Sequence, residues 1–281
     1  MSELFEFTRP ITAPTAQIAN ITIETQPLVI VSDTNDSEML PIPIILAADS
    51  RKYYGAHPES NWAILGSLMA GAYPAYGDRD KETDHSLIGI LNTGITVFIC
   101  LQAEYIARVP ESVWRKAAGI RPYMLDIERL LACKDLYPDL TVATTFADIE
   151  FHHLPIVDCK TGADDTVWEF AKQIAQMIRD GKKIYLHCWG GHGRTGTLVC
   201  LIYHILYGIT ATEAIVYCNR VHRFRTFQIE VGSPQTAEQE AQVRRLINAS
   251  ILRRRQMELA AKIEAAAEMV VETETEKNTD V

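Results

Sequence analysis

The segment from His187 to Gly196 reads HCWGGHGRTG and separates a cysteine from an arginine by five residues, three of them glycines. A glycine-rich turn between a strand and a helix lets successive backbone N–H groups point inward. Together with the helix N-terminus, they form a cradle for a doubly charged oxyanion. The Arg194 guanidinium adds a planar, bidentate hold. The segment therefore predicts an anion site made of Trp189, Gly190, Gly191, His192, Gly193 and Arg194.

The same positive field acts on Cys188. A thiol beside an arginine and a helix N-terminus is held as the thiolate more readily than a free cysteine. A thiolate beneath a bound phosphoryl group is placed for in-line attack. Thr195 follows the arginine, and we expect its hydroxyl to donate to the thiolate and stabilise it as a leaving group. One segment is thus predicted to supply both a nucleophile and a transition-state clamp.

This segment matches the Cys-x5-Arg-Ser/Thr signature of protein tyrosine phosphatases and most resembles the dual-specificity branch. The run NWAILGSLMAGAYP at 61–74 is similar to the start of small enzymes related to kinase-associated phosphatase. The resemblance covers about Trp62 to Arg245. It implies an α/β domain of the tyrosine-phosphatase type, with a mostly parallel central sheet flanked by helices. It also implies a phosphocysteine intermediate and no metal or organic cofactor.

Members of that family carry an aspartate general acid upstream of the cysteine. Here Asp158, in the run PIVDC, stands 30 positions before Cys188. The resemblance implies that Asp158 protonates the departing oxygen and later takes a proton from water. Asp164 or Asp165 is the alternative, although both better fit the cap of a helix.

A third segment, SPQTAEQEAQV at 233–243, resembles the glutamine loop that positions the hydrolytic water in tyrosine phosphatases. The resemblance implies this role for Gln235, with Gln239 as the alternate. The same run fits a helix start, with Ser233 as N-cap and Pro234 at the first helical position. Both interpretations can hold together.

Alternating strand and helix patterns position these residues. Short apolar runs predict buried strands at 96–100 and 183–187, and 151–157 is a further candidate. Helical spacing covers 166–179, an apolar helix covers 195–207 before Gly208, and another helix runs from about 236 into the 260s. Strand–loop–helix units in series predict an α/β domain with a central sheet.

Composition divides the chain into three parts. Residues 1–60 hold six prolines and short β-branched runs, which predicts an irregular N-terminal extension. The phosphatase domain is expected at 61–250. Residues 251–281 are expected to be helical and then, from Val271, a disordered acidic tail.

Composition and net charge argue against several classes of function. With 27 basic and 36 acidic residues, the net charge of −9 gives no general attraction to nucleic acid or to anionic membranes. No signal-peptide pattern opens the chain, and no apolar run reaches the about 18 residues of a membrane span. Six cysteines without a CxxC pair predict neither zinc nor a disulfide framework. We therefore expect a cytoplasmic protein; the oligomeric state stays open.

Three further features leave alternatives open. Cysteines at a strand end comparable to that of Cys100 bridge to the nucleophile in relatives, so the resemblance implies a Cys100–Cys188 bridge beside the plain buried cysteine. His187 is expected to order the loop by hydrogen bonding. The basic run NRVHRFR either contacts acids that flank a phosphorylated residue or forms a solvated face; it contains Arg220, His222, Arg223 and Arg225.

The resulting hypothesis is a phosphomonoester hydrolase that acts on phosphotyrosine, and also on phosphoserine and phosphothreonine, in phosphorylated proteins. One alternative is a phosphoinositide or inositol-phosphate phosphatase, which the absence of lysine from the loop makes less favourable. Another is a catalytically silent phosphate-binding module.

Overall fold

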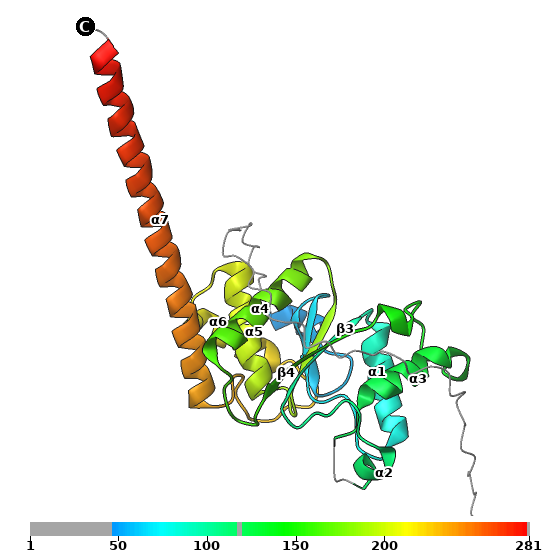
Figure 1. Cartoon of the computed structure of the whole chain (residues 1–281). Coiled ribbons are helices and arrows are strands. Elements are labelled where there is room, and N and C mark those ends of the chain that lie inside the picture. The colour runs from blue at the N-terminus through cyan, green and yellow to red at the C-terminus, as the bar shows by residue number, and fades with distance from the viewer. Residues whose placement is uncertain (1–46, 117–119, 280–281) are drawn as a thin grey trace, which may run out of the picture.

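A five-stranded sheet forms the centre of the protein, with helices on both faces (Figure 1). The structure is a computed structural model and describes residues 47–116 and 120–279. Most of the predicted N-terminal extension, residues 1–46, lies outside the described residues. The strand order is β1-β2-β5-β3-β4.

The strands are β1 (Ser60–Ile64), β2 (Leu68–Gly71), β3 (Val97–Gln102), β4 (Glu150–Ile156) and β5 (Ile184–His187). The β1–β2 pair is antiparallel and the other three pairings are parallel. The mostly parallel sheet is thereby confirmed, and β3, β4 and β5 match the strands expected from the sequence. In register, His187 lies beside both Gly71 and Cys100. The C-terminal ends of three strands therefore meet where β5 runs into the glycine-rich loop.

The two faces of the sheet carry separate hydrophobic clusters. Helices α1 (Asp80–Asn92) and α3 (Tyr123–Ala132) cover the cluster around Phe98 and Tyr185. The other face packs on α4 (Asp164–Arg179), α5 (Gly193–Tyr207), α6 (Ala211–His222) and the start of α7 (Ala237–Thr279). Because α5 is apolar nearly all round, it is buried among these helices.

The remaining elements are short: α2 (Glu111–Trp114), η1 (Ala47–Tyr53), η2 (Lys134–Leu136) and η3 (Phe146–Asp148). Among the described residues no single helix is both long and apolar enough to cross a membrane, although α5 and α6, bent by 120°, pass that test as a pair.

Helix α7 begins close to its predicted start at about 236, but it runs past its predicted end and has a different N-cap residue. It begins at Ala237 and continues to Thr279, through the acidic segment from Val271 that we expected to be disordered. Alanine, glutamate and methionine, which recur in the later part of the helix, have high helix propensity. At the N-terminus, the backbone N–H of Gln239 donates to Oγ1 of Thr236 at 3.2 Å, so Thr236 caps the helix in place of Ser233.

Candidate active site

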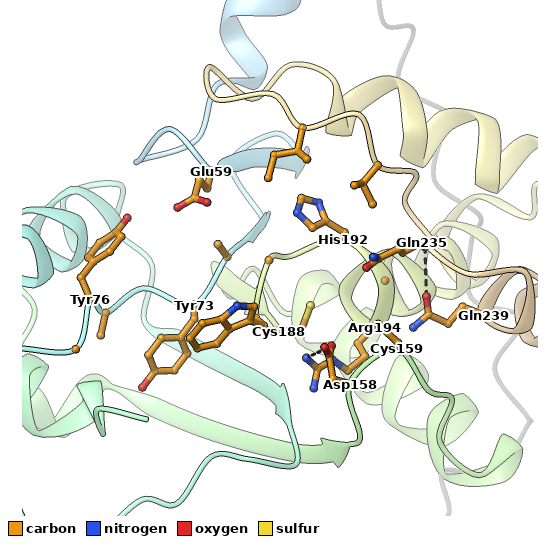
Figure 2. A pocket seen from close by; sticks show the side chains of 18 of the residues that line it. Glu59, Tyr73, Tyr76, Asp158, Cys159, Cys188, His192, Arg194, Gln235 and Gln239 are labelled. Carbon is orange, nitrogen blue, oxygen red and sulfur yellow. Dashed lines mark hydrogen bonds and ion pairs between the residues drawn. The ribbon is translucent and has the colours of Figure 1, made fainter. Parts of the chain in front are cut away.

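The predicted anion loop lies between the end of β5 at His187 and the start of α5 at Gly193. It forms the floor of a cavity of about 530 Å³ (Figure 2). Cys188 is 3% exposed and reaches this cavity. Of the predicted site residues, those that line the cavity are Cys188, Trp189, Gly190, His192, Gly193, Arg194, Asp158 and Gln235. Gly191 and Thr195 do not line it.

The tight path of the loop depends on glycine at position 191. Its φ is +70°, in the left-handed region that side chains rarely adopt. A Cβ at this position would also collide with the backbone carbonyl of Gly71 on β2. Only glycine therefore lets the loop follow this path and pack against β2.

Arg225 holds this loop from behind. Its Nη1 donates to the carbonyl of Gly190 at 2.9 Å and its Nη2 to that of Gly191 at 2.8 Å. The same guanidinium donates from Nε to Oδ1 of Asn61 at 2.9 Å. Burial lowers the pKa of Arg225 to about 10, so it stays charged at neutral pH. Two loop carbonyls thus bind Arg225.

For Arg225 and His222, both interpretations of the basic run are wrong. These side chains are 2% and 5% exposed, so they form no solvated face. Neither lines the cavity, so neither is placed to contact a substrate. They are buried because they fold back on the loop 30 or more residues earlier in the chain. Arg220 and Arg223 remain exposed.

Histidines fix the two ends of the loop. His192 Nδ1 lies 2.8 Å from Nε2 of His222, and the carbonyl of His192 accepts from Oγ of Ser233 at 3.0 Å. Burial, aided by the charge of Arg225, lowers the pKa of His192 to about 4 and that of His222 to about 3. Both rings are therefore neutral at physiological pH.

His187 anchors the other end, as expected from the sequence. Its Nε2 lies 2.8 Å from the hydroxyl of Tyr123, and its Nδ1 lies 3.2 Å from the carbonyl of Cys188. Burial lowers the pKa of His187 to about 3. The ring is neutral and orients the residue that carries the thiol.

Three acceptors orient Arg194, which is 2% exposed. Its Nη1 donates to the carbonyl of Ile156 at 2.8 Å and to Oε2 of Glu104 at 3.2 Å. Its Nη2 donates to Oδ1 of Asp158 at 2.7 Å, and Figure 2 shows the two side chains together beside Cys188. Sequence reasoning missed Glu104. The signal was its place just after β3, because parallel strands end at one edge of a sheet.

The alternative acid residues lie elsewhere. Neither Asp164 nor Asp165 lines the cavity. Asp164 opens α4 and accepts two hydrogen bonds from Arg245, at 2.6 and 2.8 Å. This arginine lowers the pKa of Asp164. Of these three carboxylates, Asp158 is the one that reaches the cavity.

The two candidate glutamines of the third segment, Gln235 and Gln239, both line the cavity. The Gln239 side chain is 1% exposed; its Oε1 accepts from the backbone N–H of Gln235 at 3.2 Å and of Thr236 at 3.1 Å. Its Nε2 donates to the carbonyl of Lys160 at 3.2 Å. Gln239 is therefore bound to backbone, whereas the Gln235 side chain is exposed at the cavity.

The predicted Thr195–Cys188 hydrogen bond stays a prediction, and so does the choice between a Cys100–Cys188 bridge and a plain buried cysteine. The Thr195 hydroxyl is buried and has no hydrogen-bond partner among the described residues, so a bond to the Cys188 thiolate remains a prediction. Cys100 and Cys188 are both free. Burial raises the pKa of the Cys100 thiol to about 12, which keeps it protonated.

Comparison with known proteins places this site in a family. The profile of the Swiss Army Knife protein DSP-PTPase phosphatase domain matches residues 118–260. Cyclin-dependent kinase inhibitor 3 of Mus musculus is 31% identical over 81 residues, which are 29% of this chain and 35% of that protein. The same protein of Rattus norvegicus is 29% identical over 101 residues, 36% of this chain and 48% of that one. These matches span less than half of either relative.

A crystal structure of Tk-PTP in its active form has 19% sequence identity and a TM-score of 0.44, and the alignment covers 68% of this chain and 97% of that one. The profile match extends over half of the chain and includes the whole loop from Cys188 to Arg194. The chain therefore belongs to the family of Swiss Army Knife proteins with a DSP-PTPase phosphatase domain.

Proposed function

We propose that this chain is a cysteine-dependent phosphatase that removes phosphate from phosphotyrosine, and also from phosphoserine and phosphothreonine, in proteins. The observation that carries the proposal is the shared cavity: Cys188, the buried Arg194 and Asp158 all line it. A nucleophile, an anion clamp and a proton donor are the three groups that phosphomonoester cleavage through a covalent intermediate requires.

Substrate binding changes the partners of Arg194. In the structure one arm of its guanidinium is occupied by the Asp158 carboxylate. A phosphoryl dianion in the loop takes bidentate hydrogen bonds from the same guanidinium and so competes with that carboxylate. The Asp158 carboxyl group, released from Arg194, is then free to serve the oxygen that leaves. Binding of the substrate itself thus frees Asp158 for its role as the acid.

Catalysis then follows in two steps. The Cys188 thiolate attacks phosphorus, the bond from phosphorus to the alcohol oxygen breaks, and Asp158 gives its proton to that oxygen. Water, placed by Gln235, next attacks the phosphocysteine; Asp158 takes a proton from it, and the phosphorus–sulfur bond breaks to return the thiolate. Arg194 and the loop N–H groups hold the transferred phosphoryl group in both steps.

The rim of the cavity supports a protein substrate. Trp189 is 60% exposed and stacks on Tyr73, with the ring centroids 6.1 Å apart, and Tyr76 lies farther along the rim. Aromatic side chains of this kind contact an aryl phosphate. The only lysine or arginine residues among the described residues lining the cavity are Arg79 and Arg194. Phosphoinositides with several phosphates call for more positive charge than this.

The test is phosphate release from a matched panel in EDTA: phosphotyrosine and phosphothreonine peptides against phosphoinositides in detergent micelles. We expect the phosphotyrosine peptides to give the highest kcat/KM. Faster turnover of the lipids would make the phosphoinositide phosphatase the better assignment. Tight phosphopeptide binding without release of phosphate by the wild-type chain would indicate the silent binding module.

A further inference from the structure

Helix α7 carries an apolar stripe that no described part of the chain covers. Its first turns pack on the domain, where Val243 and Ile247 are buried in the core. Beyond Ile251 the helix projects away from the domain (Figure 1). There Leu252, Leu259 and Ile263 are 57%, 60% and 62% exposed. Large apolar side chains at this exposure on a projecting helix indicate a surface for a partner.

The spacing of these residues is that of a coiled coil. Leu252, Leu259 and Ile263 follow at intervals of seven and four residues, so at about 100° per residue they lie within about 40° of one another. Gln256 and Ala266 fall on the same face, and the sequence continues the spacing with Val270. This gives heptads with Gln256, Ile263 and position 270 at a, and Leu252, Leu259 and Ala266 at d.

Packing supplies most of the stability of such a helix. In proteins most of the stability of a helix comes from tertiary packing of its amphipathic face and not from helix propensity. The projecting part, residues 252–279, is about 42 Å long at 1.5 Å per residue. A partner must therefore present an apolar stripe of similar length.

Charge along the helix indicates what that partner is. Positions 253–262 carry four basic residues and one acid, and positions 268–276 carry four glutamates and no lysine or arginine. A second copy in antiparallel orientation places each basic half against an acidic half. A parallel copy places arginine against arginine and glutamate against glutamate, which is unfavourable.

We propose that α7 binds a second copy of this chain, and that the two α7 helices pair antiparallel along the stripe from Leu252 to position 270. In the register that aligns a with d positions, Ile263 faces Ala266 and Leu259 faces position 270 of the other copy. The same register sets Arg253 and Arg255 level with positions 274 and 276, which are both glutamate in the sequence. The apolar positions and the flanking charges are thus matched in the same alignment of the two helices.

This pairing leaves room for both domains. In the proposed register, position 250 of each copy lies about 44 Å from position 250 of the other along the axis. A domain of about 200 residues has a radius of gyration of about 16 Å. The domains therefore sit at opposite ends of the helix pair without collision, and each catalytic cavity, which contains no α7 residue beyond Gln239, stays as it is.

Sedimentation equilibrium of the full chain over a wide concentration range tests the contact. We expect a mass that rises from the 31.5 kDa of one chain toward twice that value. Leu259→Glu and Ile263→Glu should stay monomeric. Met257→Glu is the matched control, because Met257 is 57% exposed but lies about 140° around the helix from Leu252. A monomeric wild-type chain, or equal weakening by Met257→Glu, would overturn the proposal.

Charge reversal tests the orientation. Arg253→Glu with Arg255→Glu should raise the dissociation constant tenfold or more, and Glu274→Lys with Glu276→Lys should do the same. An equimolar mixture of the two variants should dimerise again, because each reversed half meets its complement. Dimers of wild-type strength from either variant alone would overturn the antiparallel arrangement. Unchanged aryl phosphate hydrolysis in every variant verifies that the domain is folded.

Discussion

Replacement of Arg225 by methionine removes the hydrogen bonds that hold the glycine-rich loop between β5 and α5. Arg225 is 2% exposed and donates to the carbonyls of Gly190 and Gly191 at 2.9 and 2.8 Å. Methionine fills similar space but donates nothing. The freed carbonyls can then turn toward the cavity, where an anion meets carbonyl oxygens in place of N–H groups. A loop that loses even one such donor should bind the transition state much less tightly.

The expected size follows from these contacts. Loss of one oxyanion donor costs about 10²–10³ in rate, so we expect kcat/KM for an aryl phosphate to fall by about this factor in Arg225→Met. Each carbonyl left without a partner costs about 1–3 kcal/mol, which the removal of a buried charge partly offsets. We therefore expect the free energy of unfolding to fall by about 2–4 kcal/mol, or about 5–15 °C in Tm.

Steady-state kinetics and thermal unfolding on the same samples measure both effects. Arg223→Met is the matched control, since Arg223 is nearby and exposed, and it should leave both values unchanged. Arg225→Lys is the second variant, for use where Arg225→Met does not fold. Lysine keeps the positive charge but cannot donate to both carbonyls as the guanidinium does, so its kcat/KM should lie between those of wild type and Arg225→Met. A folded Arg225→Met protein with kcat/KM within about twofold of wild type would refute the reasoning.

Three other outcomes are expected. Asp158→Asn should lower kcat for phosphotyrosine peptides by about 10²–10⁴ and lower it less for aryl phosphates with good leaving groups; equal losses in stopped assays would contradict an acid role. Burial lowers the pKa values of His57, His187, His192 and His222 to about 4, 3, 4 and 3. Below pH about 6.5 the unfolded chain therefore binds more protons than the folded protein. The free energy of unfolding should be constant above that pH and fall between pH 6.5 and pH 4, by up to about 5 kcal/mol per pH unit for four histidines. A Tm that does not change across this range would contradict the burial of neutral histidines. Cys100 should stay unlinked to Cys188 under peroxide, because burial keeps its thiol protonated; a linked Cys100–Cys188 peptide in mass spectrometry would contradict the plain buried cysteine.

The sequence predicted which residues gather at the cavity because most of their signal is local. Cys188, Arg194 and the glycines between them lie in one short run, and the cavity brings Asp158 to them as expected. The alternation of apolar strands with helices predicted the parallel part of the sheet because burial on both faces leaves continuous apolar runs.

The residues that hold the site were harder to predict because they act over long separations. Arg225 lies 34 and 35 positions from the carbonyls it binds, and Glu104 lies 90 positions from Arg194. A buried arginine and an exposed one look alike in a single sequence. Ser233 fitted a helix cap by type, but its hydroxyl donates to the carbonyl of His192 instead. Residue type alone does not distinguish a local cap from a tertiary contact.

The central claim is that Cys188 carries the phosphoryl group during turnover. Rapid acid quench of the wild-type protein with an aryl phosphate, in EDTA, followed by peptide mass spectrometry, tests it most directly. We predict one added phosphoryl group on the peptide that contains Cys188, and neither that adduct nor turnover in Cys188→Ser. Sustained hydrolysis by Cys188→Ser, or a phosphoryl group on another residue, would contradict the account.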